Sequence, residues 1–459
     1  PALAKDVFIL LLIYTGAAML IAILFWFVYR DSTKAALVTF FIMACNFFFG
    51  STHEFLKKIF DHSFTTRLSF IIPTMMILIL AFIIYVKKSK HDFLRTTRYL
   101  NILLLLLVLL DGGKIVSKFI NSKGPAVSDL SQSLKICDTC TTPDIYFIIT
   151  DEYAGKTELK ELFSFDNSAF ENELHARGFH IINNSTSNYN ATVYSLASML
   201  NMDYIKNMDK PSVVNHRDML MCQGLIKTNS LVSFLQKNGY SFYNNSFFDI
   251  ADKKKVFHNI FFSTNRSLLT HQTFINRFIY HFGTRFTSDE KIATIKMNSL
   301  YSDITIDSLT RITVLQKDAK AKFVYSHLKM PHHPYFFDSL GNKTSVQQLT
   351  DSFAMNRKAY ISYLKFANKK LLSLIDFIQK NTGKPTAVIL MSDHGFRQLS
   401  GDVDRKYHFM NLNAVFLPDS NYSGFYDGMS NVNQFSVTLN TLFGQKLPML
   451  KDSTSFLTE

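Results

Sequence analysis

Apolar residues crowd the first part of the chain, where they form four long runs. Residues 7–29 contain no charged side chain, and three further runs cover residues 35–49, 68–86 and 99–110. The second run can extend to residue 55, and the fourth to residue 120 if its lysines snorkel or face other helices. Because about 20 apolar residues are enough to cross a bilayer, we predict four transmembrane helices. A soluble helical bundle is the alternative, and a cleaved signal peptide explains at most the first run.

The charged residues between the runs predict how these helices are oriented. The loop of residues 87–98, KKSKHDFLRTTR, is the most basic and is therefore expected on the cytoplasmic side. The fourth helix then carries the chain out, so that everything after about residue 120 is extracytoplasmic, as is the amino terminus. The loop of residues 57–67 also lies outside in this arrangement, in spite of its lysines. Because the chain starts at Pro1 without a Met, we expect an earlier segment to be missing.

The pattern changes after the transmembrane region of residues 1–120. Residues 121–142 are polar and lack periodicity, so they are interpreted as a linker. Strands are expected within residues 143–155, 179–182, 240–243, 322–327, 385–397 and 411–417, and helices at residues 166–177, 192–200, 229–237 and 349–379. Strands that alternate with helices predict an α/β domain over residues 143–459, with a mostly parallel sheet sandwiched by helices.

Two of the expected strands end abruptly in acidic residues. They are PDIYFIITDEYAG, residues 143–155, and PTAVILMSDHGFR, residues 385–397. Ligands of parallel sheets bind beyond the carboxyl ends of the strands, so Asp151, Glu152, Asp393 and His394 are expected to gather at one edge. Carboxylates with an imidazole are suitable ligands for a divalent metal. The alternative is two ordinary strands that end in solvated turns.

A third stretch, SNYNATVYSLASML, places a hydroxyl at the expected start of a helix. Thr192 stands where an Asn-, Ser- and Thr-rich loop runs into that helix. Unpaired backbone N–H groups and the positive end of the helix dipole favour an alkoxide or a bound phosphate there. A metal beside the hydroxyl would activate it as a nucleophile. The alternative is that Thr192 only caps the helix.

Histidines follow another expected strand, in FVYSHLKMPHHPYFFD. Extended geometry before a proline makes neighbouring side chains alternate, so His332 and His333 are expected to point in opposite directions. Only one of them can then face the metal, and a surface histidine pair is the alternative. His408, in RKYHFMNLNAVFLP, is a weaker candidate, and Arg397 closes the SDHGFR segment.

The charge balance and the cysteine content indicate which kinds of partner and metal site are expected. The chain of 459 residues has 49 Lys and Arg against 36 Asp and Glu, which fits a membrane surface or anionic substrates. No zinc-finger spacing, RNA-recognition signature or basic helix is present, so nucleic acid is not an expected partner. Cys137 and Cys140 form a single CxxC. Because there is no second CxxC, a zinc site is not expected, and the two cysteines form either a disulfide or two free thiols.

The order of these pieces resembles the sulfatase-like branch of the alkaline phosphatase superfamily. The matching pieces are Asp-Glu after the first strand, the hydroxyl at a helix start, HLKMPHHPY, and SDHGFR. The resemblance runs from about residue 143 to the end, including LFGQKLPMLKDSTSF. Membrane helices followed by such a domain are similar to lipoteichoic acid synthase and the lipid A phosphoethanolamine transferases.

The resemblance implies roles for individual residues. Asp151, Thr192, Asp393 and His394 would be metal ligands, and Thr192 also the nucleophile. His332 matches the substrate-side histidine of an H-x-P motif, and His408 matches a later histidine. Additional candidates are Glu152, His333 and Arg397. The implied metal is zinc or manganese, with magnesium or calcium as alternatives.

The resemblance also implies a reaction and a place. A phosphoethanolamine- or phosphoglycerol-type headgroup would pass from a phospholipid donor to a glycan or glycolipid acceptor through a phospho-threonine. The enzyme would lie in the bacterial inner membrane, with its catalytic domain periplasmic or extracellular. A phosphodiesterase or phosphatase, with water as acceptor, is the first alternative, and a non-catalytic membrane protein of the same fold is the second.

The chain departs from the family pattern at two points. The transferases have Glu-Thr where this chain has Asp151-Glu152, which is closer to the paired acids of sulfatases. True sulfatases need a Cys or Ser in a C/S-x-P-x-R motif, and no such motif occurs in the sequence. The missing motif argues against hydrolysis of sulfate esters and for phosphoryl chemistry at a threonine.

Overall fold

The chain divides into two compact units. The first comprises Pro1–Ser122 and Phe261–Ser288, and the second comprises Lys123–Ile260 and Asp289–Glu459. The computed structural model describes all residues except 1, 61–63, 122–133, 138, 207–213, 215, 257–269, 271, 280–288, 350–353, 399–402 and 459. Most of the predicted linker therefore lies outside the described residues.

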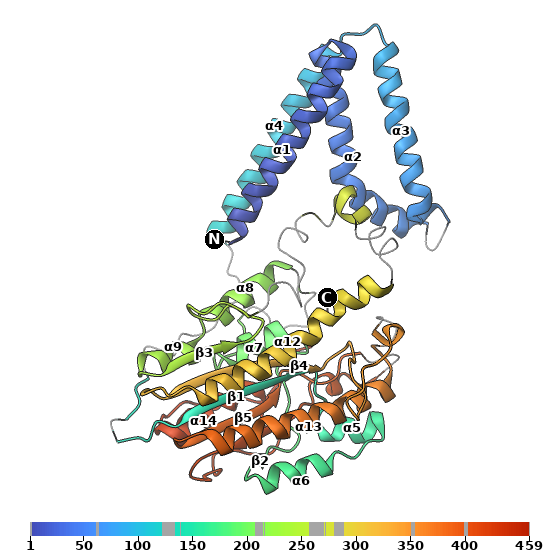
Figure 1. The fold of residues 1–459 in the computed structure, drawn as a ribbon. Coiled ribbons are helices and arrows are strands. Elements are labelled where there is room, and N and C mark those ends of the chain that lie inside the picture. The colour runs from blue at the N-terminus through green and yellow to red at the C-terminus, as the bar shows by residue number, and fades with distance from the viewer. Residues whose placement is uncertain are drawn as a thin grey trace. The chain divides into compact units, whose positions relative to one another are not determined.

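Long helices make up the first unit (Figure 1). They are α1 (Ala2–Tyr29), α2 (Ser32–Ile59), α3 (Leu68–Lys88) and α4 (Leu94–Asn121). Three candidate membrane spans are found among the described residues: Val7–Tyr29, Ser32–Lys57 and Leu68–Lys88. The large apolar side chains of α1 and α3 are mostly exposed, as they must be to contact lipid. The chain is thus a membrane protein. The fourth predicted run forms helix α4, which is not among these candidate spans, so its crossing of the membrane stays a prediction.

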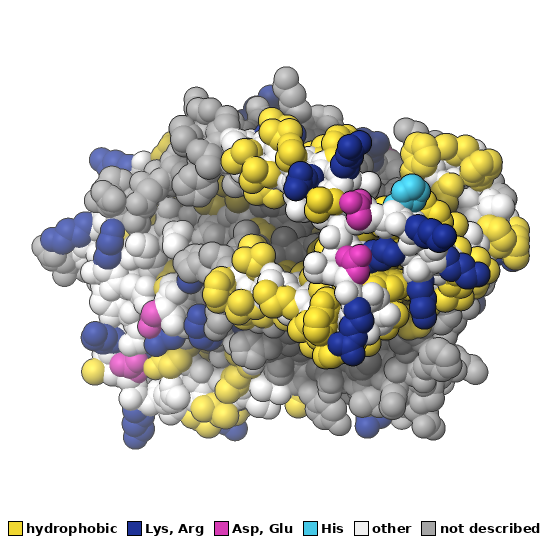
Figure 2. All heavy atoms as spheres, turned by 90° about the horizontal axis from the view of Figure 1, so that it is seen from above, with side chains coloured by type: hydrophobic (Ala, Val, Ile, Leu, Met, Phe, Trp, Pro, Cys, Tyr) yellow, Lys and Arg dark blue, Asp and Glu magenta, His cyan; other side chains and the backbone are white. Residues whose placement is uncertain are grey.

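One end of this helical unit is strongly basic. The α1–α2 turn and the α3–α4 loop lie together there, because Lys34 Nζ donates to the Ser89 carbonyl oxygen at 2.8 Å. Lys87, Lys88 and Lys90 are exposed at the same end, where Figure 2 shows Lys and Arg side chains gathered among apolar ones. This distribution supports the prediction that the loop faces the cytoplasm.

The second unit is built on a six-stranded sheet in the order β2-β6-β5-β1-β4-β3 (Figure 1). The strands are β1 (Asp144–Asp151), β2 (His180–Ile181), β3 (Ser241–Asn245), β4 (Lys322–Pro331), β5 (Thr386–Ser392) and β6 (Asn413–Phe416). Strand β1 is parallel to β4 and β5, and β3 is parallel to β4, whereas β6 is antiparallel to both β5 and β2. The expected α/β fold with a mostly parallel sheet is confirmed.

Helices bury both faces of the sheet. They are α5 (Lys156–Phe163), α6 (Ser168–Ala176), α7 (Thr192–Met199), α8 (His216–Lys227), α9 (Ser230–Lys237), α12 (Asp289–Leu315), α13 (Arg357–Asn381) and α14 (Gln434–Phe443). On one face, the ring of Phe147 packs edge-on against Phe435 of α14, with ring centroids 4.8 Å apart. On the other face, Ser326 Oγ of β4 lies 2.7 Å from Thr310 Oγ1 of α12. Every residue of β1 is buried, which explains its continuous apolar sequence.

The structure corrects one helix boundary and adds helices that the pattern did not predict. Helix α13 begins at Arg357 rather than at residue 349, because the Asn356 side chain accepts a hydrogen bond from the Ala359 N–H and caps the helix. Helices α5, α8, α12 and α14 were not predicted. The sequences of α8 and α12 mix polar and apolar residues without a clean apolar stripe, so periodicity does not reveal them.

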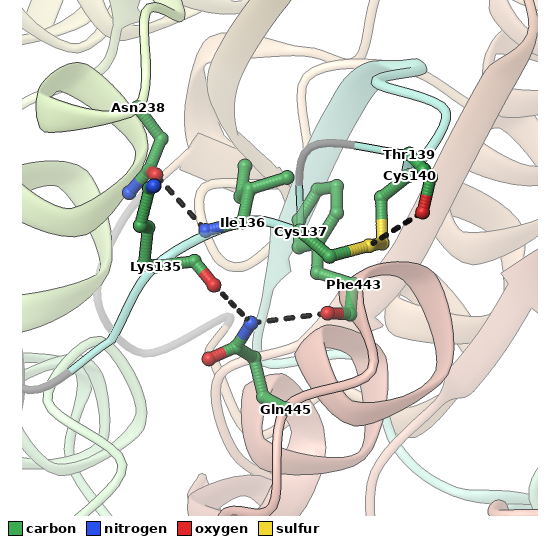
Figure 3. The surroundings of a disulfide bond; sticks show 8 residues. All are labelled: Lys135, Ile136, Cys137, Thr139, Cys140, Asn238, Phe443 and Gln445. Carbon is green, nitrogen blue, oxygen red and sulfur yellow. Dashed lines mark hydrogen bonds between the residues drawn. A yellow bond between two sulfur atoms is a disulfide. The ribbon is translucent and has the colours of Figure 1, made fainter.

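The CxxC pair forms a disulfide just before β1 (Figure 3). Cys137 and Cys140 have their Cα atoms 5.2 Å apart, which confirms the disulfide among the alternatives left open by the sequence. The preceding residues are held against the second unit. Asn238 Oδ1 accepts from the Ile136 N–H at 3.0 Å, and Gln445 Nε2 donates to the Lys135 carbonyl at 2.7 Å. The chain is therefore attached to the second unit before it enters the sheet.

Candidate active site

The two acid-ending strands lie side by side in the sheet. Thr150 of β1 pairs with Ser392 of β5, so the next residues, Asp151 and Asp393, come together at the carboxyl edge. Asp151, Asp393 and His394 are fully buried, and each offers one ligand atom within 4.8 Å of the others. These are three of the four residues that the sequence analysis assigned to a metal.

Three of the four carboxylate oxygens of Asp151 and Asp393 accept no hydrogen bond from the described residues. Asp393 Oδ1 accepts from the backbone N–H groups of Glu152 and His394, at 3.2 and 2.9 Å. Asp393 Oδ2 and both carboxylate oxygens of Asp151 have no hydrogen-bond partner among the described residues. Burying unpaired carboxylate oxygens is costly unless a cation compensates them. The donor set therefore fits a divalent metal, which prefers such oxygens together with an imidazole nitrogen.

The His394 ring directs its Nε2 towards the carboxylates of Asp151 and Asp393. Its Nδ1 lies 2.7 Å from the Gly395 carbonyl oxygen, so the proton sits on Nδ1 and Nε2 carries the lone pair. Nε2 is 3.4 Å from Asp393 Oδ2 and 3.8 Å from Asp151 Oδ1. Burial is the main cause that lowers the pKa of His394 to about 4. A neutral imidazole with a free Nε2 is the form that binds a metal.

Thr192 is brought to this group from a distant part of the chain. It is the first residue of α7, and its Oγ1 lies 3.3 Å from His394 Nε2. The N-cap position belongs to Ala191, so the Thr192 hydroxyl is not used as a helix cap. One turn later, Ser195 Oγ donates to the Asp393 carbonyl oxygen at 2.6 Å. That bond ties the start of α7 to the loop that carries Asp393 and His394.

Burial and nearby negative charge raise the pKa of Asp151 and of Glu152. The pKa of Asp151 lies well above its usual value because of burial first, then the nearby charges of Asp393 and Glu152. Burial raises the pKa of Glu152 to about 7, although Arg397 opposes the shift. Glu152 Oε1 accepts from the Arg397 backbone N–H at 2.8 Å, and the Arg397 side chain contributes its charge there.

Lys329 is a charged residue near the site that sequence reasoning did not single out. It is nearly fully buried in β4, and its positive charge lowers the pKa of Asp151 and of Glu152. The signal was present in the sequence, since a lysine within the apolar run KFVYSHLKMP is unusual for a strand buried on both faces.

The two adjacent histidines point to different surroundings. His332 Nε2 lies 3.6 Å from Glu152 Oε2, next to the acid group. His333 is buried and packs edge-on against Tyr335, with ring centroids 5.2 Å apart. Burial is the first cause that lowers the pKa of His332, followed by the charges of Lys329 and Arg397. His332 is therefore a neutral base at the edge of the acid group.

A sequence model of the sulfatase family, described as "Sulfatase", matches residues 147–436 of the chain. That match covers more than half of the chain and both acid-ending strands. The chain belongs to the sulfatase family. It is therefore an enzyme of the alkaline phosphatase superfamily, as the resemblance in sequence predicted.

A comparison with solved structures found proteins of similar fold. The zinc complex of the C-terminal periplasmic domain of EcEptC from Escherichia coli has a TM-score of 0.44 and 14% identity, and the match covers 73% of this chain and 94% of that chain. The integral membrane protein lipooligosaccharide phosphoethanolamine transferase A (EptA) from Neisseria meningitidis has a TM-score of 0.42 and 12% identity, with coverages of 89% and 82%. No curated protein matches the chain.

In this sulfatase-family chain a segment near the carboxyl terminus is bonded to the loop before Thr192. Two asparagines of the loop before Thr192 hold it in place. Asn190 Nδ2 donates to the Leu457 carbonyl at 3.1 Å, and Asn190 Oδ1 accepts from the Leu457 N–H at 2.8 Å. Asn188 bonds to the backbone of Ser453 and Ser455. We call residues 452–457 the C-terminal strap.

The strap contacts the later histidine. The ring of Phe456 packs edge-on against His408, with centroids 5.2 Å apart, and Arg405 Cζ lies 4.6 Å from the centre of the Phe456 ring. The His408 carbonyl oxygen accepts from the Gly395 N–H at 3.0 Å, which connects His408 to the loop of His394. Burial first, then Arg397 and Arg405, lowers the pKa of His408. The sequence resemblance includes residues 452–456, but it assigned no role to them, and the contact with His408 comes only from the structure.

Proposed function

We propose that this enzyme transfers a phospholipid headgroup phosphate to a glycan or lipid hydroxyl, with Thr192 as nucleophile. The observation that carries the proposal is the placement of the Thr192 hydroxyl, 3.3 Å from His394 Nε2 at the start of α7. A hydroxyl at a helix start, next to buried acids that call for a cation, is suited to attack on phosphorus.

The choice of phosphate over sulfate rests on the nucleophile. The family's sulfate-ester chemistry needs a Cys or Ser in C/S-x-P-x-R, and this chain has Thr192 in N-A-T-V instead. A threonine hydroxyl can form a phosphoester directly, without prior modification of the side chain. The positive charges of Arg397 and Lys329 beside the acid group are also suited to an anionic substrate.

The residues proposed to hold the metal are Asp151, Asp393 and His394, with Thr192 Oγ1 beside them. The orphaned oxygens of the two aspartates and the free Nε2 of His394 are the observation that supports this assignment. When bound, a divalent ion would polarise the phosphoryl oxygens and lower the pKa of the attacking hydroxyl. Zinc or manganese fits the mixed oxygen and nitrogen donors best, with magnesium or calcium as alternatives.

Each half of the proposed reaction exchanges one phosphorus–oxygen bond. Thr192 Oγ1 forms a bond to phosphorus, the bond to the diacylglycerol oxygen breaks, and the Thr192 proton passes to that oxygen. The acceptor hydroxyl then attacks phosphorus, the bond to Thr192 breaks, and the acceptor proton returns to Thr192. His332 and His408 are proposed to carry these protons, since burial lowers the pKa of both and keeps them neutral near pH 7.

The membrane helices support a lipid donor. An active site joined to a membrane anchor meets phospholipid headgroups at high effective concentration, which favours them over soluble esters. We propose that the protein lies in a bacterial inner membrane, with the transmembrane region in residues 1–120, a linker in residues 121–142 and a periplasmic or extracellular catalytic domain in residues 143–459.

The first experiment looks for the covalent intermediate. Protein in proteoliposomes of total bacterial lipid is quenched in acid, digested and analysed by mass spectrometry. We expect a phosphoethanolamine or phosphoglycerol adduct on the peptide that contains Thr192, and no adduct in Thr192→Ala. The control is Thr157→Ala, whose hydroxyl bonds to Asn184 Oδ1 at 3.0 Å outside the acid group. An adduct that persists in Thr192→Ala would show that another residue is the nucleophile.

The second experiment separates transferase from hydrolase. Proteoliposomes with headgroup-labelled phosphatidylethanolamine or phosphatidylglycerol are incubated with and without a glycolipid acceptor. We expect slow release of diacylglycerol alone, faster release with acceptor, and label on the acceptor. If the label appears only as free phosphoethanolamine or glycerol phosphate, at a rate that no acceptor changes, the enzyme is a hydrolase.

A further inference from the structure

Part of the catalytic sequence belongs structurally to the membrane unit. The chain leaves the second unit after Ile260 and returns to it at Asp289, and the intervening Phe261–Ser288 groups with the transmembrane helices. Of this segment, Thr270 and residues 272–279 are described, and residues 274–279 are helical. We call residues 272–279 the foot. The sequence pattern did not predict it.

The foot is bonded to the second half of α2. The Gly50 N–H donates to the Gln272 carbonyl oxygen at 2.8 Å, and Asn46 Oδ1 accepts from the Ile275 N–H at 3.3 Å. The ring of Phe274 packs edge-on against Phe49, with centroids 5.1 Å apart. A Cβ at position 50 would lie 2.7 Å from the Gln272 carbonyl oxygen and 2.8 Å from its Cα, so this close approach requires glycine.

Charged side chains hold the same contact. Arg277 forms an ion pair with Glu54, and Gln272 Nε2 donates to Glu54 Oε1 at 3.0 Å. Arg277 Nη1 also lies 3.2 Å from His53 Nδ1, while His53 Nε2 lies 3.0 Å from the Thr66 carbonyl oxygen. The foot is thus connected to the end of α2 and to the turn before α3.

In the foot, polar side chains face another helix and apolar side chains are exposed, which is the reverse of the usual arrangement in a water-soluble protein. Its polar side chains Gln272 and Arg277 face α2, whereas Ile275, Phe278 and Ile279 are 54%, 40% and 63% exposed. On α2 itself, Phe48 and Phe55 are also exposed, on the helix face away from the bonded positions, and they belong to the candidate span Ser32–Lys57. Exposed apolar side chains that continue a lipid-facing surface are expected to contact lipid.

We propose that the foot is a membrane-interface anchor, by which the catalytic chain returns to the bilayer and inserts Ile275, Phe278 and Ile279 among the lipids. The position along α2 agrees with this depth, because Gly50 lies about 27 Å along the helix from Ser32, close to one bilayer thickness. The proposal rests on the membrane spans and not on the proposed reaction.

The foot also determines how many times the chain crosses the membrane. If the foot inserts beside the carboxyl end of α2, the chain that continues from it towards the second unit starts on the same side of the bilayer as that end of α2. Helix α3 carries the chain to the other side. The chain reaches the catalytic unit on the original side only if α4 also crosses. The ion pair of Asp111 with Lys114 reduces the cost of placing both charges in such a helix.

Quenching by brominated lipids tests the lipid contact. The full chain, with Trp26 replaced by Phe, receives one tryptophan, either as Ile279→Trp or as Leu340→Trp on the catalytic unit, where Leu340 is 79% exposed. In proteoliposomes we expect strong quenching of the tryptophan at position 279 and no quenching at position 340. Equal quenching at both positions would overturn the proposal.

Charge reversal tests the contact with α2 in the same assay. We expect Arg277→Glu to lose the quenching at position 279, and the double variant Glu54→Arg with Arg277→Glu to regain it. Gly50→Ala should also lose it, whereas Gly16→Ala should not, because no heavy atom lies within 4 Å of a Cβ built at Gly16. Unchanged quenching in both Arg277→Glu and Gly50→Ala would show that the foot binds lipid without α2. Neither outcome depends on any enzymatic activity.

Discussion

Thr192 Oγ1 lies 3.3 Å from Nε2 of His394, although the two residues are 202 positions apart in the chain. The distance is maintained by backbone geometry rather than by the two side chains alone. Thr192 begins α7, and Ser195 on the next turn bonds to the Asp393 carbonyl. Any change in the loop after β5 will therefore alter both the acid group and the candidate nucleophile.

Removing a carboxylate should remove the metal and its stabilising effect together. We expect Asp393→Asn to lose bound metal and activity, because Oδ2 accepts no hydrogen bond from the described residues and the amide supplies no negative charge. A chelator should lower the melting temperature of the wild type and leave that of Asp393→Asn unchanged. Mass spectrometry measures the bound metal, and thermal unfolding with and without the chelator measures its stabilising effect. His333→Ala is the matched control, and full metal content in Asp393→Asn would show that the site lies elsewhere.

Gly395 should not tolerate a side chain. A Cβ there would lie 2.3 Å from the Tyr407 carbonyl oxygen and 2.6 Å from that of Met410. We expect Gly395→Ala to destabilise the protein by about 2–3 kcal/mol, the usual cost of overpacking. Gly383→Ala meets no heavy atom within 4 Å and should be neutral. Thermal unfolding compares the two variants, and equal melting temperatures would contradict the prediction.

Asp303 should make stability depend on pH. Its carboxylate accepts from the backbone N–H groups of Lys329 and Met330, at 2.5 and 3.1 Å, beside the start of the histidine segment. Burial raises the pKa of Asp303 from 3.8 to about 7, so the folded state favours the protonated form. The stabilisation that this carboxyl provides is therefore complete below about pH 4 and is lost as the pH rises towards 7.

The variant Asp303→Asn isolates that effect. We expect the free energy of unfolding of the wild type to fall relative to the variant between about pH 4 and pH 7. The amide leaves one backbone N–H without an acceptor, which costs about 1–3 kcal/mol at every pH. Parallel curves for the two proteins over this range would refute the assignment to Asp303.

The strap should position His408. We expect Phe456→Ala to lower turnover by about tenfold, equivalent to about 1.4 kcal/mol of transition-state energy. Water that enters beside His408 should bring its pKa back up towards the usual value, so the acid limb of the pH–rate profile should move to higher pH. Leu340→Ala, at an exposed position, is the control. Lower turnover with an unmoved pH profile would indicate a structural role only.

Thiol labelling in intact cells should report the orientation of the membrane unit. With Cys45 and Cys222 replaced, we expect Ser89→Cys, in the basic α3–α4 loop, to resist membrane-impermeant reagents. Leu340→Cys on the catalytic unit should react, because an odd number of crossings separates the two positions. The reverse pattern would place the catalytic unit in the cytoplasm.

Local pattern was enough to predict the membrane runs and the two acid-ending strands. Each is encoded within a few consecutive residues: an uncharged run long enough for a bilayer, or an apolar run closed by Asp151 or by Asp393. The start of α7 at Thr192 was also predicted, because a polar loop followed by a helical pattern is a local signal.

Only the tertiary structure decided which distant residues meet. The strand order β5-β1-β4 places Asp393, Asp151 and the histidine segment next to one another, and no local pattern encodes that order. Lys329 and the foot were missed for the same reason, and the strap, although part of the sequence resemblance, was given no role. Their roles come from contacts with residues far away in the chain, namely Asp151, His408 and Gly50. Hydrophobic periodicity reports how a segment is buried, whereas the identity of its neighbours depends on how the whole chain packs.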